Sequence, residues 1–169
     1  MTILNILNYP DPRLHTVATS VAKVTDQHKK LIMNMAETMY KAPGIGLAAT
    51  QVNHHERIIV IDISENKDNL LVLVNPEILE KKGEQLCEEG CLSLPGVYEK
   101  VSRAEWVKIK ALDTSGKQFI IETDGLLSVC IQHEMDHLLG KVFVEYLSPL
   151  KKSRIRLKML KQSKQRKTP

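Results

Sequence analysis

The sequence has few aromatic residues, few cysteines and no long apolar run. Aromatic residues make up 4% of the chain, so a stacking platform for single-stranded nucleic acid is not expected. No stretch has the length of a membrane span, and the start of the chain lacks the basic and apolar regions of a secretory signal. The three cysteines form no C-x-x-C motif. We therefore expect a protein of the reducing cytoplasm, without a membrane segment.

Length and charge indicate one domain with a basic extension. The chain has 169 residues, of which 43% are hydrophobic and 26% charged, a balance typical of one globular domain. Residues 151–169 contain nine Lys and Arg residues and no acidic residue, whereas 1–150 contain 15 basic and 20 acidic residues. We therefore expect a single catalytic domain over 1–147 and an appended basic helix and tail over 148–169. A mildly acidic body argues against sequence-specific DNA binding.

Apolar periodicity predicts an α+β fold. A four-residue apolar repeat predicts a helix over 27–40 with Asp26 as N-cap, and the Gly- and Pro-rich segment 42–52 predicts a tight loop. A second helix, apolar nearly all round, is expected to end before Gly140 and to lie in the middle of the domain. Ser148 and Pro149 predict the start of a third helix. Strand-like patterns cover 57–63, 70–74, 106–111 and 118–122. The prediction is an α+β domain with mixed or antiparallel strands around the central helix.

The motif HEMDH, His133 to His137, lies on that central helix. Residues i and i+4 of a helix share a face, so both imidazoles can reach one metal ion beside Glu134. Shuffling this composition yields H-E-x-x-H only about once in sixty chains. The alternative, a buried helix whose histidines bond backbone carbonyls, leaves the polar cluster in an apolar helix unexplained.

A catalytic metal needs a third protein ligand as well as an open position. No histidine follows His137, and Phe143 stands where the extended metalloprotease pattern has its third histidine. Upstream, His54 and His55 lie in a polar stretch and are expected to face solvent. Cys91, next to Gly90 in EEGCLSLP, is therefore the favoured third ligand.

Three segments together resemble the signature motifs of bacterial peptide deformylases. They are GIGLAATQ (44–51), EGCLSLP (89–95) and QHEMDHL (132–138). YPDPRL near the start and SPLKKSRIRLK near the end also resemble that family, so the similarity covers essentially the whole chain. The resemblance implies a metal-dependent hydrolase of a linear amide, which removes the N-formyl group from N-formylmethionyl nascent peptides and releases formate.

The resemblance also implies a role for individual residues. Cys91, His133 and His137 are expected to hold one divalent metal, with Fe²⁺ as the native ion and Ni²⁺ or Zn²⁺ as substitutes. Glu134 is expected to take a proton from the metal-activated water and pass it to the leaving amine. The Gln51 amide and the backbone N–H of Leu92 are expected to stabilise the oxyanion.

Substrate binding is expected at the first motif and on the central helix. By resemblance, Ile45 and Gly46 form an edge that pairs with the substrate backbone, which places Gly46 with the catalytic group as well. Gly90 lets the chain approach closely at the second motif. The methionine pocket is expected to draw on Ile45, Leu126, Val129 and Cys130, although ordinary core packing is the alternative for each of these side chains.

Two rival functions and several partners remain as hypotheses. A zincin-like peptidase is one rival, and a structural-zinc module that binds RNA through the basic tail is the other. Cys87 is a weaker candidate ligand, and Arg103 is a candidate partner of Asp136. By resemblance, the basic C-terminal helix is expected to dock on the ribosome, where it would meet RNA phosphates. We expect a monomer.

Overall fold

The computed structural model describes residues 2–167. Three α-helices, seven strands and three short 3₁₀ turns make up the described chain. The helices are α1 (Asp26–Lys41), α2 (Gly125–Leu138) and α3 (Pro149–Lys167), and the 3₁₀ turns are η1 (Pro12–His15), η2 (Ala49–Val52) and η3 (Phe143–Tyr146). The strands are β1 (Gly46–Ala48), β2 (Ile58–Ile61), β3 (Leu71–Lys82), β4 (Gln85–Cys91), β5 (Leu94–Arg103), β6 (Trp106–Leu112) and β7 (Gln118–Asp124).

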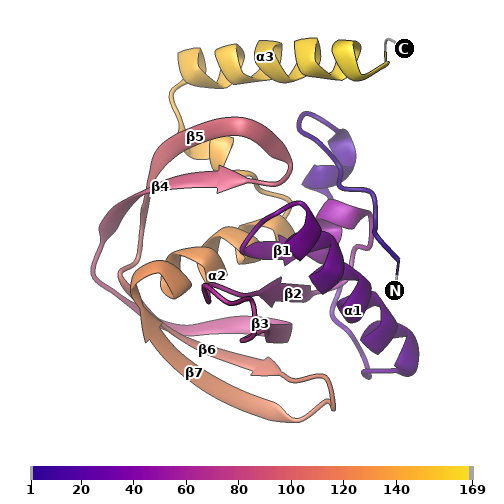
Figure 1. Ribbon diagram of the computed structural model, residues 1–169. Coiled ribbons are helices and arrows are strands. Elements are labelled where there is room, and N and C mark those ends of the chain that lie inside the picture. The colour runs from indigo at the N-terminus through magenta and orange to yellow at the C-terminus, as the bar shows by residue number, and fades with distance from the viewer. Residues whose placement is uncertain (1, 168–169) are drawn as a thin grey trace.

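The strands form one five-stranded sheet, in the order β1-β2-β3-β6-β7, and a separate hairpin of β4 and β5. All neighbouring strands pair antiparallel. Helix α2 lies between this sheet and the β4–β5 hairpin, and α3 lies beyond the hairpin (Figure 1). The predicted α+β class, with a central helix and a C-terminal helix, is confirmed.

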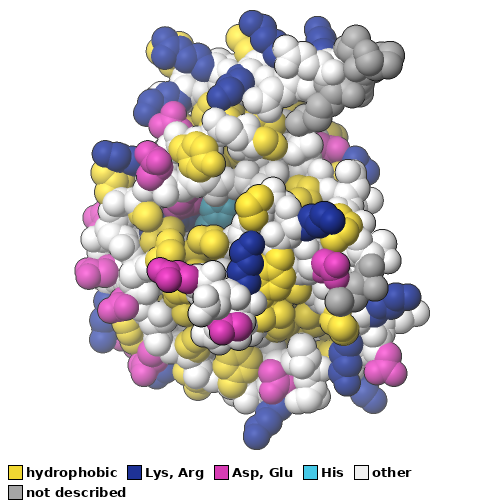
Figure 2. Space-filling view, in the orientation of Figure 1, with side chains coloured by type: hydrophobic (Ala, Val, Ile, Leu, Met, Phe, Trp, Pro, Cys, Tyr) yellow, Lys and Arg dark blue, Asp and Glu magenta, His cyan; other side chains and the backbone are white. Residues whose placement is uncertain are grey.

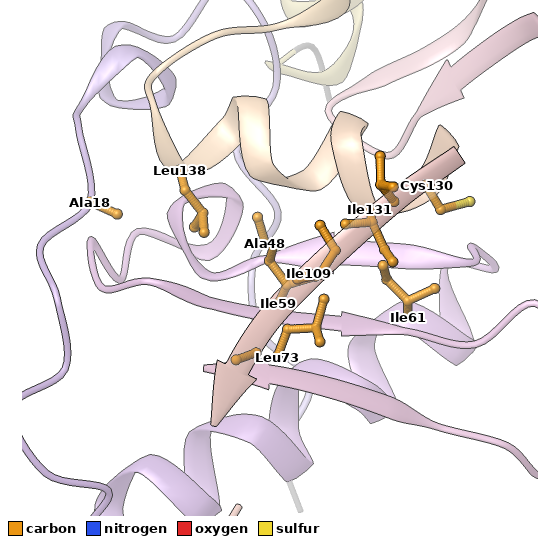
Figure 3. Packing of buried hydrophobic residues seen from close by; sticks show 11 residues of the cluster. Ala18, Ala48, Ile59, Ile61, Leu73, Ile109, Cys130, Ile131 and Leu138 are labelled. Carbon is orange, nitrogen blue, oxygen red and sulfur yellow. The ribbon is translucent and has the colours of Figure 1, made fainter. Parts of the chain in front are cut away.

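Strand β2 is buried along its whole length because both faces of the sheet are covered. Its alternate residues divide between two apolar clusters, as the period of a strand requires. Ile59 and Ile61 pack with Ile131 and Leu138 of α2 (Figure 3), whereas Ile58 and Val60 belong to the cluster that contains the α1 methionines. The sheet therefore holds α2 on one face and α1 on the other.

The predicted start of α1 was off by one residue. Asp26 is the first residue of the helix, and Thr25 is its N-cap. Thr25 Oγ1 accepts from the His28 N–H, while His28 Nδ1 accepts from the Thr25 N–H at 3.0 Å. A histidine takes the place of the usual Glu or Gln in this capping box, which is why the pattern did not stand out in the sequence.

The segment 42–52 contains more structure than the predicted loop. Gly46–Ala48 pair with β2 as strand β1, and η2 follows directly. The β4–β5 hairpin was not predicted at all, and β3 runs eight residues further than the expected 70–74, to Lys82. The β6–β7 hairpin and the position of Gly140 after α2, with a φ of 79°, agree with the prediction.

The C-terminal helix is anchored to the body of the domain. Ile155 and Met159 are buried in a third apolar cluster, together with Leu94, Val97 and Phe143. Its lysines and arginines gather at the outer side of the molecule in Figure 2. Within residues 2–167, no helix is both long enough and apolar enough to cross a membrane.

Candidate metal centre and substrate cavity

Three side chains from two elements converge at the centre of the molecule. His133 and His137 lie one turn apart on α2, and Cys91 ends strand β4. One ligand atom from each of the three lies within 4.8 Å of the other two. Cys91 Sγ and His137 Nε2 are 3.3 Å apart, and both histidines are buried. The i, i+4 spacing places the two imidazoles together, and the β4–β5 turn brings the thiol to them.

Glu134 lies beside this group with one oxygen unused. The residue is 4% exposed, and its Oε2 has no hydrogen-bond partner in the described structure. Burial raises the pKa of Glu134 to about 7, with His133 lowering it and Glu89 raising it by smaller amounts. A Cβ at Gly46 would lie 3.0 Å from Glu134 Oε1, so the glycine leaves room for the carboxylate. A buried carboxylate whose pKa lies near neutrality is suited to take up and release a proton.

A chain of ion pairs holds His133 through its Nδ1 atom, so that Nε2 is left free to face the other two side chains. His133 Nδ1 is 2.7 Å from Glu89 Oε1. Arg103 donates to both Glu89 oxygens, at 2.7 and 2.8 Å, and to Asp136 Oδ2 at 2.5 Å. Tyr146 donates its O–H to the same Asp136 oxygen at 2.8 Å. The suggested Arg103–Asp136 pair is confirmed.

Glu89 is the functional residue that the sequence analysis missed. It lies two residues before Cys91, and alternate residues of a strand share a face, so its side chain points toward α2 like the thiol. That spacing was the available signal. It was overlooked because strand β4 was not predicted.

Gln51 also contacts the thiol of Cys91. Its Oε1 accepts the Ala48 N–H at 2.9 Å, and its Nε2 donates to Ser93 Oγ at 3.0 Å. The same Nε2 lies 3.5 Å from Cys91 Sγ. Because the carbonyl oxygen of Gln51 is hydrogen-bonded to the backbone, its amide N–H₂ group is the end that faces Cys91. Ser93 is a second contact that the sequence analysis did not single out.

A cavity of about 820 Å³ opens onto His133 and Glu134. Figure 2 shows this cavity as a hollow in the surface, with histidine at its base and hydrophobic side chains around it. The cavity is lined by most of the residues expected to contact substrate: Ile45, Gly46, Gly90, Leu92, Leu126, Val129 and Cys130. Cys130 is buried and Leu126 is 49% exposed at the rim. Burial raises the pKa of the Cys130 thiol to about 12, so it stays protonated at neutral pH.

Strand β1 presents an unpaired edge to this cavity. It is the end strand of the sheet, and Ile45 O accepts the Asp62 N–H at 2.8 Å on its paired side. Successive peptide units of a strand point in opposite directions, so the N–H and C=O of Gly46 point away from β2. Because Gly46 also lines the cavity, its peptide groups are available there.

The other candidate ligands stay apart from the three-residue group. His54 is exposed, and His55 Nε2 lies 3.0 Å from Asn53 Oδ1. Cys87 lines the cavity but is not one of the three clustered ligands. The Phe143 ring packs 6.0 Å from the His133 ring, where it takes part in the core.

The donor set fits a catalytic divalent metal. One thiolate and two imidazoles are borderline-soft ligands, and three protein ligands leave an open position. Burial lowers the pKa of His137, which favours the neutral, coordinating form of that ring. In His133 the effect of burial is outweighed by Cys91 and Glu89, which raise its pKa. Within residues 2–167 the cluster contains no fourth ligand, so a closed structural-zinc site has no support here.

Comparison with known proteins identifies the relatives. The family model for polypeptide deformylase matches residues 3–153. Peptide deformylase 2 of Nitrosomonas europaea is 62% identical over 97% of this chain and 89% of its own length. Peptide deformylase 1 of Ralstonia nicotianae is 60% identical over 98% of this chain and 99% of its own. The crystal structure of a peptide deformylase from Legionella pneumophila superposes with a TM-score of 0.94 at 48% identity, covering 99% of this chain and all of that one.

Proposed function

The chain belongs to the polypeptide deformylase family, and on that premise we propose that Cys91, His133 and His137 hold its catalytic metal ion. The family match supports a deformylase, a hydrolase of the formyl amide, and gives no support to a zincin-like peptidase or an RNA-binding zinc module. The observation that carries the assignment of ligands is the convergence of one thiol and two imidazoles from β4 and α2. A divalent metal bound there supplies a Lewis acid that activates water at neutral pH.

Glu134 is the proton carrier of the reaction. Its unpartnered Oε2 and its pKa of about 7 support uptake of a proton from the attacking water and delivery to the leaving amine. Gln51 Nε2 and the Leu92 N–H are the proposed donors to the oxygen that gains charge, and removal of one such donor costs about 3–4 kcal/mol in other enzymes. Gly46 belongs to this group because it leaves space for Glu134.

The substrate is a formylated N-terminal methionine, bound as a short extended strand. The free peptide groups of Gly46 support pairing with the substrate backbone on the β1 side, and Gly90 lines the cavity from β4. The methionine side chain occupies the apolar part, lined by Ile45, Leu126, Val129 and Cys130. The adjacent pairing edge and apolar pocket support a peptide substrate with one buried side chain.

The native metal is Fe²⁺ in this proposal, with Ni²⁺ or Zn²⁺ able to replace it. Cys91 binds as a thiolate and donates strongly, which suits a soft ferrous site and also makes it easy to oxidise.

The basic helix α3 is the proposed ribosome contact. Nine Lys and Arg residues lie in 151–169. The segment's last two residues, 168–169, fall outside the described structure. RNA phosphates are the complementary partner of these basic side chains. The proposed catalytic segment is 1–147, and 148–169 are the basic segment appended to it, which packs on the domain through Ile155 and Met159. The enzyme acts in the cytoplasm as a monomer, where formylated nascent chains emerge.

Formate release from formyl-Met-Ala-Ser tests the proposed chemistry. Wild type and Glu134→Ala are compared at equal metal content. We expect formate from wild type and a rate roughly 10²–10⁴ times lower from the variant, the usual contribution of a general base. Absence of formate with metal-loaded wild type overturns the function, and an equal rate from both proteins overturns the role of Glu134.

A further inference from the structure

The segment between α1 and β1 forms one wall of the substrate cavity. Residues 42–46 all line that cavity, and they include the Ile45–Gly46 edge. Within this segment, the Gly44 N–H donates back to Met39 O of α1 at 2.8 Å. At its far end, the position of Ile45 depends on a residue outside the segment.

That residue is Asp62, which follows β2 and contacts both Ile45 of the segment and Tyr40 in the helix before it. Its N–H donates to Ile45 O at 2.8 Å. Its Oδ2 accepts the Tyr40 O–H at 2.6 Å, and Tyr40 lies in the last turn of α1. One aspartate therefore ties the end of the helix to the start of the cavity edge.

The carboxylate of Asp62 is held by neutral donors. Asp62 is 3% exposed, and its Oδ1 accepts from the Ser64 N–H at 2.9 Å and the Ser64 O–H at 2.6 Å, while Oδ2 also accepts the Asn69 N–H at 3.1 Å. Burial raises the pKa of Asp62, but these donors outweigh it and lower the pKa to about 2. The group is therefore charged at neutral pH. Removing a charge from water costs free energy. A buried carboxylate is therefore an unfavourable choice for a residue that only connects two strands.

We propose that Tyr40 and Asp62 are positioning residues for substrate binding, and that their hydrogen bond holds Gly46 with its peptide groups toward the cavity. The inference rests on the proposed use of the Ile45–Gly46 edge by the substrate. If the edge shifts, pairing with the peptide backbone weakens, while the metal ligands and Glu134 on α2 and β4 keep their places. The effect must therefore grow with the length of peptide that pairs.

The test is the gain in kcat/KM from formyl-methioninamide to formyl-Met-Ala-Ser, measured on the metal-loaded enzyme. In Tyr40→Phe we expect this gain to fall at least fivefold, through KM, with kcat within twofold of wild type. Tyr146→Phe is the matched control, because it removes the same atom from another O–H···carboxylate bond, 2.8 Å long, to Asp136. It should keep the gain of the wild type. A loss of folded protein alone cannot change this ratio.

An unchanged length gain in folded Tyr40→Phe overturns the proposal. If that variant does not fold, Ser64→Ala removes another donor from Asp62 and serves in the same comparison with the same criterion. Hydrogen exchange of the Asp62 amide gives an independent readout: we expect at least tenfold faster exchange in Tyr40→Phe, and unchanged exchange counts against the proposal. If wild type releases no formate, the proposed function fails, and amide exchange still decides whether Tyr40 and Asp62 hold the segment.

Discussion

His133 Nδ1 lies 2.7 Å from Glu89 Oε1, although the two residues are 44 positions apart. The bond leaves Nε2 of the same ring for coordination. Arg103 holds Glu89 in place with two hydrogen bonds. Burial raises the pKa of Glu89, but Arg103 and His133 together outweigh it and lower the pKa. A carboxylate behind a coordinating histidine orients the ring and raises its basicity.

Replacement of Glu89 should therefore weaken metal binding. In Glu89→Gln the single remaining oxygen has to serve both His133 and Arg103, and loss of such an outer contact typically costs about 10–100-fold in metal affinity. The measurement is the rate of metal loss to a chelator. Glu88→Gln, at the neighbouring exposed position, is the control and should retain metal like wild type. Equal retention in folded Glu89→Gln would show that Glu89 does not support the ligand.

Stability should depend on Asp62 at acidic pH. Its pKa is about 2 in the folded protein and about 4 in an unfolded chain. The folded state therefore binds this proton less tightly, so the stabilisation is complete above about pH 4 and is lost as pH falls toward 2. Denaturant unfolding between pH 2 and 5 should show this slope in wild type and a shallower one in Asp62→Asn. Parallel curves would contradict the assignment.

At alkaline pH the sign is reversed for Tyr40. Burial and Asp62 raise the pKa of Tyr40 to about 12, against about 10 in an unfolded chain. Its contribution is complete below about pH 10 and is lost as pH rises toward 12. Ultraviolet titration of phenolate absorbance should show that Tyr40→Phe has one tyrosine fewer that ionises near pH 12. An unchanged number of such tyrosines would argue against the raised pKa of Tyr40. Tyr146, whose pKa is also about 12, remains as the internal reference.

The iron form should lose activity in air. A thiolate ligand makes a ferrous centre easy to oxidise, so we expect a shorter half-life in air than under argon, and protection in the Ni²⁺ form. Activity is followed as formate release over time. Equal half-lives of the iron form in air and under argon would contradict this prediction.

Charge on α3 should govern ribosome binding without affecting chemistry. Deletion of 150–169 is a poor test because Ile155 and Met159 are part of the core. We instead expect Arg154→Gln with Arg156→Gln and Lys161→Gln, all exposed positions, to weaken sedimentation with ribosomes at low salt. Cleavage of formyl-Met-Ala-Ser should stay at the wild-type rate. Ribosome binding that equals wild type would remove the proposed role of α3.

The sequence predicted those features whose cause is local. The His133–His137 spacing follows from the pitch of one helix, and Gly140 after α2 follows from its tolerance of positive φ. Glu89 and Arg103 were not predicted as a pair that supports His133, because that contact needs the β4–β5 hairpin. The hairpin itself was hidden because its Gly and Pro residues interrupt the alternation on which strand prediction depends. Tertiary pairing thus supplied the support of the site, while the local periodicity of one helix predicted only its two histidines; Cys91 was predicted from its place beside Gly90 and from the family resemblance.

X-ray absorption at the metal edge of the metal-loaded enzyme tests the central claim most directly. The account predicts one sulfur and two imidazole scatterers around a single ion, with sulfur absent in Cys91→Ser. A first shell without sulfur in wild type, or one completed by a fourth protein side chain, would contradict it.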